Sequence, residues 1–149
     1  MRLTDYGRRQ AFMLNPLYEG NQAVITHVHS SDLQRCIDTA YYALGFPANP
    51  DHITHSRLLR EINFGTEEGL HFDSLQEQEK ERISSKEYKA EGGESWSDVK
   101  SRMEEFFGGL DAGNHLVFSH GGAMASVLQD FGVEAMPNNG SIAGVTFDD

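Results

Sequence analysis

The sequence predicts an α/β fold of three layers, α/β/α, in which a mostly parallel open sheet lies between two layers of helices. Runs rich in β-branched residues alternate with runs of helical periodicity along the 149 residues, and this alternation is typical of parallel sheets covered by helices. Two expected strand-to-helix junctions, residues 29–35 and 119–122, are rich in Ser, His and Gly. Ligands of such sheets bind at the carboxyl ends of the strands, so we expect a site there.

The amino-terminal part is expected to begin with a helix that Thr4 caps and that ends near Pro16. Residues 23–28 are predicted to form a strand because Val, Ile and Thr dominate that run. The Ser-Ser-Asp sequence at 30–32 is expected to cap a second helix over residues 33–44. A glycine and a proline then end that helix.

The middle of the chain carries weaker signals. Residues 46–56 are predicted to be a loop, residues 58–69 irregular, and the charge-rich residues 72–88 helical in part. Ser95 is expected to cap an amphipathic helix, whose buried face shows the helical spacing of a packed core. The residues of that face are Trp96, Val99, Met103, Phe106 and Leu110.

The carboxyl-terminal part predicts strand, tight turn, helix and strand in succession. The strand covers residues 115–118, the turn 119–122 and the helix 123–131. A last strand is expected over residues 142–147. The length fits a single domain spanning 1–149.

Composition excludes several classes of protein. The net charge of −11 argues against nucleic-acid binding, which needs a basic surface. No apolar run is long enough to span a membrane, and the first residues show no secretory signal. The single cysteine, Cys36, suits a reducing compartment, so a cytoplasmic location is expected. In so acidic a chain, an anionic ligand would need arginines concentrated in one pocket.

Three residues could carry chemistry. His120 follows an expected strand and precedes two glycines, so it could donate hydrogen bonds to a phosphoryl group or act as a base. Arg35, in the first turn of a helix, could bind a phosphate through two parallel hydrogen bonds. Glu61 lies among apolar residues that could raise its pKa for general-acid work. For each of these residues taken alone, an ordinary structural role is the more common one.

Five segments, in order, give the chain a resemblance to a known family. Residues 3–11 (LTDYGRRQA), 30–40 (SSDLQRCIDTA), 59–69 (LREINFGTEEG), 92–95 (GGES) and 119–122 (SHGG) resemble motifs of the histidine phosphatase superfamily, the phosphoglycerate-mutase-like proteins. Each segment is modest alone, whereas the ordered set is specific.

The resemblance implies a role for each matching residue. Arg35 would bind the transferring phosphoryl group and His120 would stabilise it. Glu61 would protonate the leaving oxygen and later activate water. Ser31 and the backbone at Gly121 would add hydrogen bonds. The family uses neither metal nor cofactor, and its nucleophile is a second histidine that forms a phosphohistidine.

That second histidine lies in an Arg-His-Gly motif at the end of the family's first strand, and no Arg-His-Gly occurs in the 149 residues. We therefore expect a domain that lacks its first strand and its nucleophile, and that is inactive by itself. His29 is a weak candidate for a substitute, because in-line attack requires tight geometry.

Several functions remain open. Only 22 residues separate Gly69 from Gly92, and the absence of the mutases' longer insert favours hydrolysis of a small phosphorylated metabolite over phosphoglycerate mutase activity. A catalytically dead phosphate-binding or interaction module is the second alternative. A metal site of His27 and His29, with His52 or His55, is a minor one. A serine hydrolase is excluded because no Gly-x-Ser-x-Gly occurs. The oligomeric state is not predicted.

Overall fold

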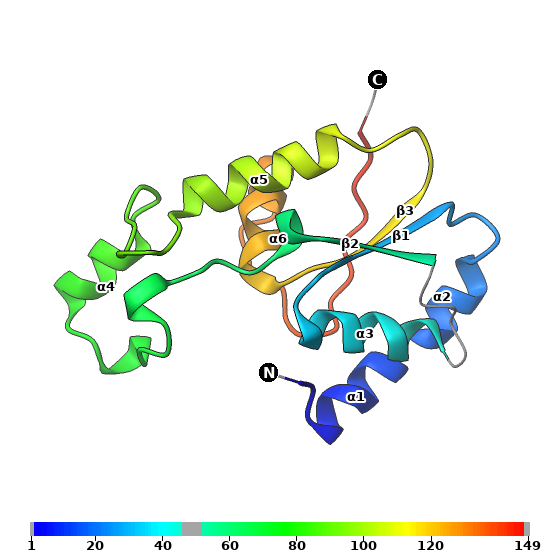
Figure 1. Cartoon of the computed structure of the whole chain (residues 1–149), viewed down its shortest axis with the longest axis horizontal. Helices are drawn as coiled ribbons and strands as arrows, with labels where there is room; N and C mark the ends of the chain where they lie inside the picture. Colours follow the sequence, from blue (N-terminus) through cyan, green and yellow to red (C-terminus); the bar gives the residue numbers. More distant parts are fainter. Residues whose placement is uncertain (1, 46–51, 148–149) are drawn as a thin grey trace.

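A computed structural model describes residues 2–45 and 52–147. Its centre is a parallel three-stranded sheet in the order β2-β1-β3 (Figure 1). The strands are β1 (His27–Ser31), β2 (Ile53–Ser56) and β3 (His115–Phe118). The predicted parallel α/β architecture is therefore confirmed.

Helices cover both faces of this sheet (Figure 1). One layer contains α1 (Asp5–Phe12), α2 (Asn15–Asn21) and α3 (Gln34–Leu44). The other contains α5 (Trp96–Gly108) and α6 (Gly121–Leu128), which the 3-10 helix η5 (Gln129–Phe131) extends. Figure 1 shows a helical layer on each side of the strands, as predicted.

Two hydrophobic clusters form because neighbouring residues of a strand point to opposite faces. On one face, Val117 packs with Leu59 and with the buried residues of α5 and α6. On the other face, Leu116 and Phe118 pack with Ala40 of α3. The buried positions of α5 are Val99, Met103 and Phe106, which confirms the predicted apolar face of that helix.

A lobe projects from the body between β2 and α5 (Figure 1). It begins after the 3-10 helix η2 (Arg57–Leu59), which follows β2 directly. It contains the 3-10 helices η3 (Gly65–Glu67) and η4 (Phe72–Ser74) and the helix α4 (Glu77–Ser84). Helix α4 has no buried residue, as its charge-rich sequence predicts.

The amino-terminal prediction is wrong in two details. The first helix ends at Phe12, and Pro16 lies in the first turn of α2, where a residue without an N–H is tolerated. Strand β1 begins at His27 rather than at residue 23. The apolar Val24 instead closes a turn with Asn21, because partner strands, and not hydrophobicity, determine which residues form the ladder.

The cap of the second helix also differs. The N-cap of α3 is Leu33 and has no side-chain cap. Ser31 accepts a hydrogen bond from the Leu33 N–H (3.2 Å), whereas the Asp32 carboxylate binds Arg60. The Ser-Ser-Asp sequence therefore shapes the loop before the helix.

Two strand predictions are corrected as well. Residues 53–56 form β2, although they were expected to be loop; the preceding part of that expected loop, 46–51, lies outside the described residues. Residues 142–147 form no strand. In that segment Phe147 instead packs against Phe107 and Phe131. Both errors have one cause, since a short strand exists only where another strand pairs with it.

The last helix of the chain begins earlier than predicted. Helix α6 starts at Gly121, two residues before the predicted start, and residues 129–131 are 3-10 helix. Within residues 2–45 and 52–147, no helix is long and apolar enough to cross a membrane.

Candidate functional site

His120 lies between β3 and α6, at the carboxyl edge of the sheet where the sequence predicts a site. The side chain is buried, and its Nε2 lies 2.9 Å from the Ser31 Oγ at the end of β1. Burial lowers the pKa of His120 to about 4, and the positive charges of Arg35 and Arg102 contribute to the decrease. His120 is therefore neutral at neutral pH, with one ring nitrogen able to donate and the other able to accept a hydrogen bond.

Arg35 lies in the first turn of α3, half-buried, with its charge acting on His120. Its guanidinium makes no hydrogen bond or ion pair with any residue that the structure describes. A guanidinium without a carboxylate partner is available for an anion. The structure thus brings together Arg35, Ser31 and His120, as the sequence predicts.

The Glu61 carboxylate is fixed at the amino end of α6. Its Oε1 accepts hydrogen bonds from the N–H groups of Ile62 and Ala123, and its Oε2 accepts one from Gly122, all at 3.0 Å. A carboxylate at this end of a helix is stabilised by the N–H groups that lack partners within the helix. Glu61 is therefore held next to His120, in a defined orientation.

Gly121 and Gly122 have different roles. A Cβ at position 122 would lie 2.6 Å from the Glu61 Oε1 and 2.9 Å from the Trp96 ring, so glycine is required for Glu61 to reach the helix. The N–H of Gly121 has no hydrogen-bond partner among the described residues. Of the backbone groups after His120, it is the one still available to an anion.

Two ion pairs that sequence reasoning missed fix the loops around the site. Arg60 binds Asp32 through two 2.7 Å hydrogen bonds, joining the loop after β1 to the segment that carries Glu61. The hydrogen bond with Arg60 is the largest influence that holds the pKa of Asp32 below its ordinary value. Both residues are within the matched motifs, but no sequence signal links them.

The second pair joins Arg102 of α5 to Glu94 (2.8 Å). The Arg102 side chain is only 13% exposed, and it also donates to the carbonyl oxygens of Leu58 (2.7 Å) and Glu61 (3.2 Å). Glu94 in turn accepts from the Asn63 N–H (3.0 Å). This network holds the backbone on both sides of Glu61.

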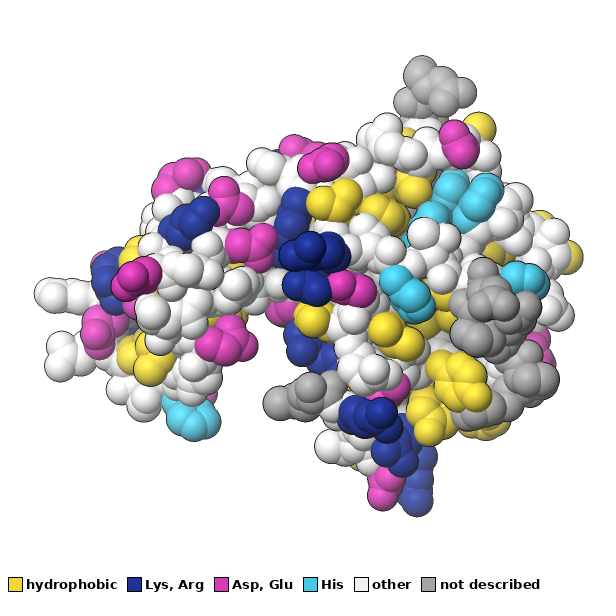
Figure 2. Space-filling view, in the orientation of Figure 1, with side chains coloured by type: hydrophobic (Ala, Val, Ile, Leu, Met, Phe, Trp, Pro, Cys, Tyr) yellow, Lys and Arg dark blue, Asp and Glu magenta, His cyan; other side chains and the backbone are white. Residues whose placement is uncertain are grey.

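Charge is concentrated near this edge of the sheet. Figure 2 shows Lys and Arg side chains gathered at the centre of one face, where Figure 1 places the turn after β2. They lie beside a hollow that separates the α4 lobe from the α1–α3 side (Figure 2). A local positive potential of this kind can attract an anion despite the net charge of −11.

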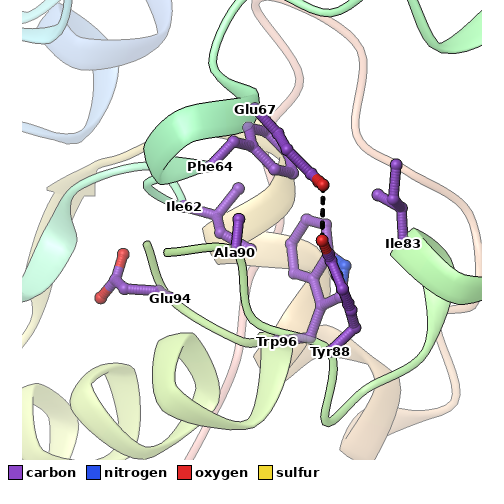
Figure 3. A pocket seen from close by; sticks show the side chains of 8 residues that line it. All are labelled: Ile62, Phe64, Glu67, Ile83, Tyr88, Ala90, Glu94 and Trp96. Atoms are coloured by element: carbon purple, nitrogen blue, oxygen red, sulfur yellow. Dashed lines mark hydrogen bonds between the residues drawn. The ribbon is translucent and has the colours of Figure 1, made fainter. Parts of the chain in front are cut away.

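A small enclosed cavity lies away from the site, at the base of the lobe. There Glu67 and Tyr88 face each other above Trp96 (Figure 3). Its volume of about 10 Å³ has room for one water molecule. A larger hollow of about 300 Å³, lined by residues that include Tyr18 and His27, lies at the opposite end of β1 from Ser31.

His29 does not join His120. Its Nε2 lies 2.9 Å from the Nδ1 of His115, at the opposite end of β3, so the alternative of His29 as a nucleophile is not supported by the geometry. The alternative of a metal site grouped His27 and His29 with His52 or His55. The ring that stacks with both His27 and His29 is instead that of His115. Within the described residues no group of three His, Cys, Asp or Glu could hold a metal ion.

Known proteins resemble this chain over nearly its whole length. A model of the histidine phosphatase superfamily (branch 1) matches residues 1–143. No curated protein matches significantly. The structure of TTHB049 from Thermus thermophilus is 33% identical, with a TM-score of 0.73, and the match covers 94% of this chain and 75% of that one.

Two further structures extend the comparison. A phosphoglycerate mutase from Thermus thermophilus is 31% identical over 93% of this chain and 75% of its own, with a TM-score of 0.71. Mycobacterial hydrolase 1 is 24% identical over 87% of this chain and 68% of its own, with a TM-score of 0.66. The last of these supports the fold alone.

Proposed function

Because the chain belongs to the histidine phosphatase superfamily, we propose that its site binds the phosphoryl group of a small phosphorylated metabolite and serves hydrolysis through a phosphohistidine. The observation that carries the proposal is the guanidinium of Arg35, which has no partner among the described residues, beside the neutral, buried His120. Arg35 and His120 would bind the phosphoryl oxygens, and the Gly121 N–H and the Ser31 hydroxyl would add hydrogen bonds.

Glu61 would supply the proton that the leaving alcohol needs when the P–O bond breaks. Its Oε1 accepts two hydrogen bonds and its Oε2 only one, so Oε2 has the lone pair that can hold this proton. After the alcohol leaves, the same oxygen would take a proton from the water that attacks the phosphohistidine. No metal or cofactor takes part in this scheme.

The nucleophile is the part of the reaction that these residues do not supply. The 149 residues contain no Arg-His-Gly, and His29 faces His115. We therefore expect this chain by itself to bind phosphate without turning over a phosphomonoester, which is also what the alternative of a phosphate-binding module predicts.

Phosphoglycerate mutase activity is the second candidate, favoured by the structural neighbour of that name at 31% identity. The same Arg35, His120 and Glu61 would serve it, with a second phosphate acceptor in place of water. The short segment between Gly69 and Gly92 favours hydrolysis.

The test measures binding and turnover separately, with EDTA present throughout. Inorganic phosphate is titrated into the protein while the His120 imidazole signals are followed by NMR, and hydrolysis of p-nitrophenyl phosphate is measured beside it. Phosphate binding that Arg35→Gln weakens, without turnover, is the expected result. His71→Ala, in the exposed lobe, is the matched control for His120→Ala.

Two results would contradict this scheme in different ways. Absence of phosphate binding by the folded wild-type protein would overturn the proposed site. Turnover that His120→Ala abolishes would show that the site works without Arg-His-Gly, and the expected inactivity would be wrong.

A further inference from the structure

Trp96, the first residue of α5, lies where the lobe joins the body of the protein. It is half-buried, whereas Val99, one turn further along the same helix, is fully buried. Its ring packs on the hydrophobic cluster of α5 and α6 and meets the Phe64 ring edge-on, with the centroids 6.3 Å apart. The indole therefore has neighbours in both the body and the lobe.

On the side of the body, the indole lies against the backbone of Gly122. A Cβ at position 122 would meet the Trp96 ring at 2.9 and 3.0 Å and the Glu61 Oε1 at 2.6 Å. The ring edge and the carboxylate oxygen are thus both within 3.0 Å of one point beside α6. Trp96 forms a wall of the space in which the Glu61 carboxylate accepts the N–H groups of α6.

On the side of the lobe, the indole borders the enclosed cavity of about 10 Å³ that Glu67 and Tyr88 also line (Figure 3). The Tyr88 hydroxyl donates to the Glu67 Oε1, and the Arg82 guanidinium lies over the Tyr88 ring, 4.7 Å from its centroid. The Glu67 Oε2 is buried and has no hydrogen-bond partner among the described residues. A ring beside a void has fewer packing contacts on that side, so the residues around the cavity determine how firmly the indole is held against Gly122.

We propose that Trp96 is a positioning residue for Glu61, and that it makes the orientation of this carboxylate depend on the lobe. The bonded pair of Glu67 and Tyr88 keeps the indole in place. The indole in turn closes the side on which the Glu61 carboxylate could move away from α6. The inference rests on the proposed function, in which Glu61 carries the proton for the leaving alcohol, and it gives the lobe a part in that step.

An ordinary core role for Trp96 leads to a different expectation. The loss of a core contact destabilises all the elements packed around it, so its effect would extend along the whole of α6. The loss of a positioning contact affects the two N–H bonds to Glu61 and leaves the rest of the helix intact, because a helix end can open locally. Amide protons within one helix therefore distinguish the two roles.

The experiment measures amide hydrogen exchange of the full chain by NMR at a fixed pH. Gly122 and Ala123 donate to Glu61, and Val127 lies in the last turn of the same helix. Trp96→Leu is expected to raise the exchange rates of Gly122 and Ala123 by about tenfold, and that of Val127 by less than about twofold. Trp96→Phe keeps a smaller ring at this position, so a rise of about threefold at the first two amides is expected.

A variant of the lobe tests the second half of the proposal. Tyr88→Phe removes the hydroxyl that donates to Glu67 and keeps the ring. It is expected to raise the exchange rates of Gly122 and Ala123 by about threefold and to shift the fluorescence of Trp96, the only tryptophan of the chain. Tyr6→Phe, at a side chain of α1 that is 72% exposed, is the matched control and should change neither.

Two controls make the measurement specific. Phe106→Leu weakens the same hydrophobic cluster at the other end of α5, and it should not raise the exchange of Gly122 and Ala123 above that of Val127. The phosphate affinity of Trp96→Leu should stay within about twofold of the wild-type value, because other residues bind the phosphate in the proposed site. Thermal melts verify that each variant is folded, and Trp96→Phe replaces Trp96→Leu if the latter does not fold.

Each contrary result overturns a named part of the inference. A uniform rise of exchange along α6 in Trp96→Leu, or no rise, would show that Trp96 is a core residue only. A loss of phosphate affinity above about tenfold in this variant would refute a role confined to Glu61. Unchanged exchange and fluorescence in Tyr88→Phe would refute the dependence on the lobe. Absence of phosphate binding by the wild-type protein would overturn the proposed function instead, and the exchange measurements do not depend on that result.

Discussion

Histidines lie at both ends of the β1–β3 pair, and the two ends differ in what surrounds them. At the amino end, His27, His29 and His115 form a stack, with ring centroids 4.6 Å apart for His27 and His115. At the carboxyl end, the His120 ring forms its hydrogen bond with Ser31 (2.9 Å). His29 and His120 are both buried, so burial does not distinguish the two ends.

The direction of the pKa shift, downward for both His29 and His120, does not distinguish the two ends either, but its causes do. Burial lowers the pKa of His29, and the neighbouring His115 and His27 lower it further. Burial also lowers the pKa of His120, but there the added charges are those of Arg35 and Arg102. An arginine keeps its charge at all physiological pH values, whereas a histidine loses its charge above its pKa. Only the carboxyl end therefore has neighbouring groups that stay positively charged at physiological pH.

Hydrogen bonds assign the stack a structural role. The His115 Nε2 lies 2.9 Å from the Asp111 carbonyl oxygen, which can only accept, so Nε2 carries the proton. The His115 Nδ1 then accepts from the His29 Nε2–H. The remaining nitrogen, the His29 Nδ1, is buried and has no hydrogen-bond partner within residues 2–45 and 52–147. The His29 ring also packs edge-on against Phe106, with the ring centroids 5.3 Å apart.

The largest expected effect concerns this packing. Phe106→Ala is expected to lower the free energy of unfolding by about 3–5 kcal/mol, because it removes a buried ring that the His29 ring contacts edge-on. Chemical denaturation would measure the loss. Phe106→Leu is a milder companion if the first variant does not fold. A loss below about 1 kcal/mol would mean that the amino end is not a packed core.

The next effect concerns the carboxyl end. Arg35→Gln is expected to weaken phosphate binding by about 10–100-fold, equivalent to about 1.5–3 kcal/mol for lost charge-assisted hydrogen bonds. The free energy of unfolding should change by less than about 0.5 kcal/mol, because the Arg35 guanidinium has no partner within the described residues. Titration calorimetry and denaturation check the two values. A large loss of unfolding free energy with unchanged phosphate affinity would show that Arg35 stabilises the fold and does not bind the anion.

Acidification should lower the free energy of unfolding through the histidines at both ends of the β1–β3 pair. The unfolded histidines bind protons below about pH 6.5, whereas folded His120 binds one only near pH 4. The unfolded state then holds more protons, so stability that is present above about pH 6.5 decreases as the pH falls through this window. His120 alone should account for about 1 kcal/mol between about pH 7.5 and 5.5. His29 should add to the loss, because its pKa is lowered as well.

Denaturation at the two pH values, on the wild-type protein and on His120→Asn, measures this contribution. The variant should lose less stability on acidification, by about the 1 kcal/mol assigned to His120. An identical pH dependence in both proteins would show that His120 is not held neutral by the fold.

The smallest expected effect distinguishes His27 from His29 within the histidine stack. His27 is exposed, whereas His29 is buried. His27→Asn is therefore expected to change the free energy of unfolding by no more than about 0.5 kcal/mol, as chemical denaturation would measure. A loss comparable to that of a buried substitution would show that the exposed ring also supports the stack.

Local signals in the sequence were sufficient to predict several elements of the fold. Ser95 begins α5 with its hydroxyl accepting from the Asp98 N–H (3.1 Å), and Val99, Met103 and Phe106 are buried as their spacing predicts. The turn after β3 also lies where the sequence places it. Each of these features depends on residues within a few positions of one another, so a local sequence pattern is enough to predict it.

The sequence motifs single out the residues of the candidate site, but they do not indicate the contacts that those residues make. The ordered motifs identified Arg35, Glu61 and His120, and the structure brings their segments to one edge of the sheet. Their partners were missed: Glu61 bonds to Ala123, 62 positions away in sequence, and Asp32 bonds to Arg60, 28 positions away. Nothing in the spacing of the sequence indicates such pairs.

The sequence by itself determined the layered α/β class, the family, and the residue types at the carboxyl edge of the sheet. Only the tertiary structure decided that residues 53–56 pair as a strand while residues 142–147 do not. It also decided that His29 packs against His115 and that Asp32 pairs with Arg60. The physical reason is that helices and turns form from neighbouring residues, whereas strand pairing, ion pairs and stacked rings join residues that are far apart in the chain.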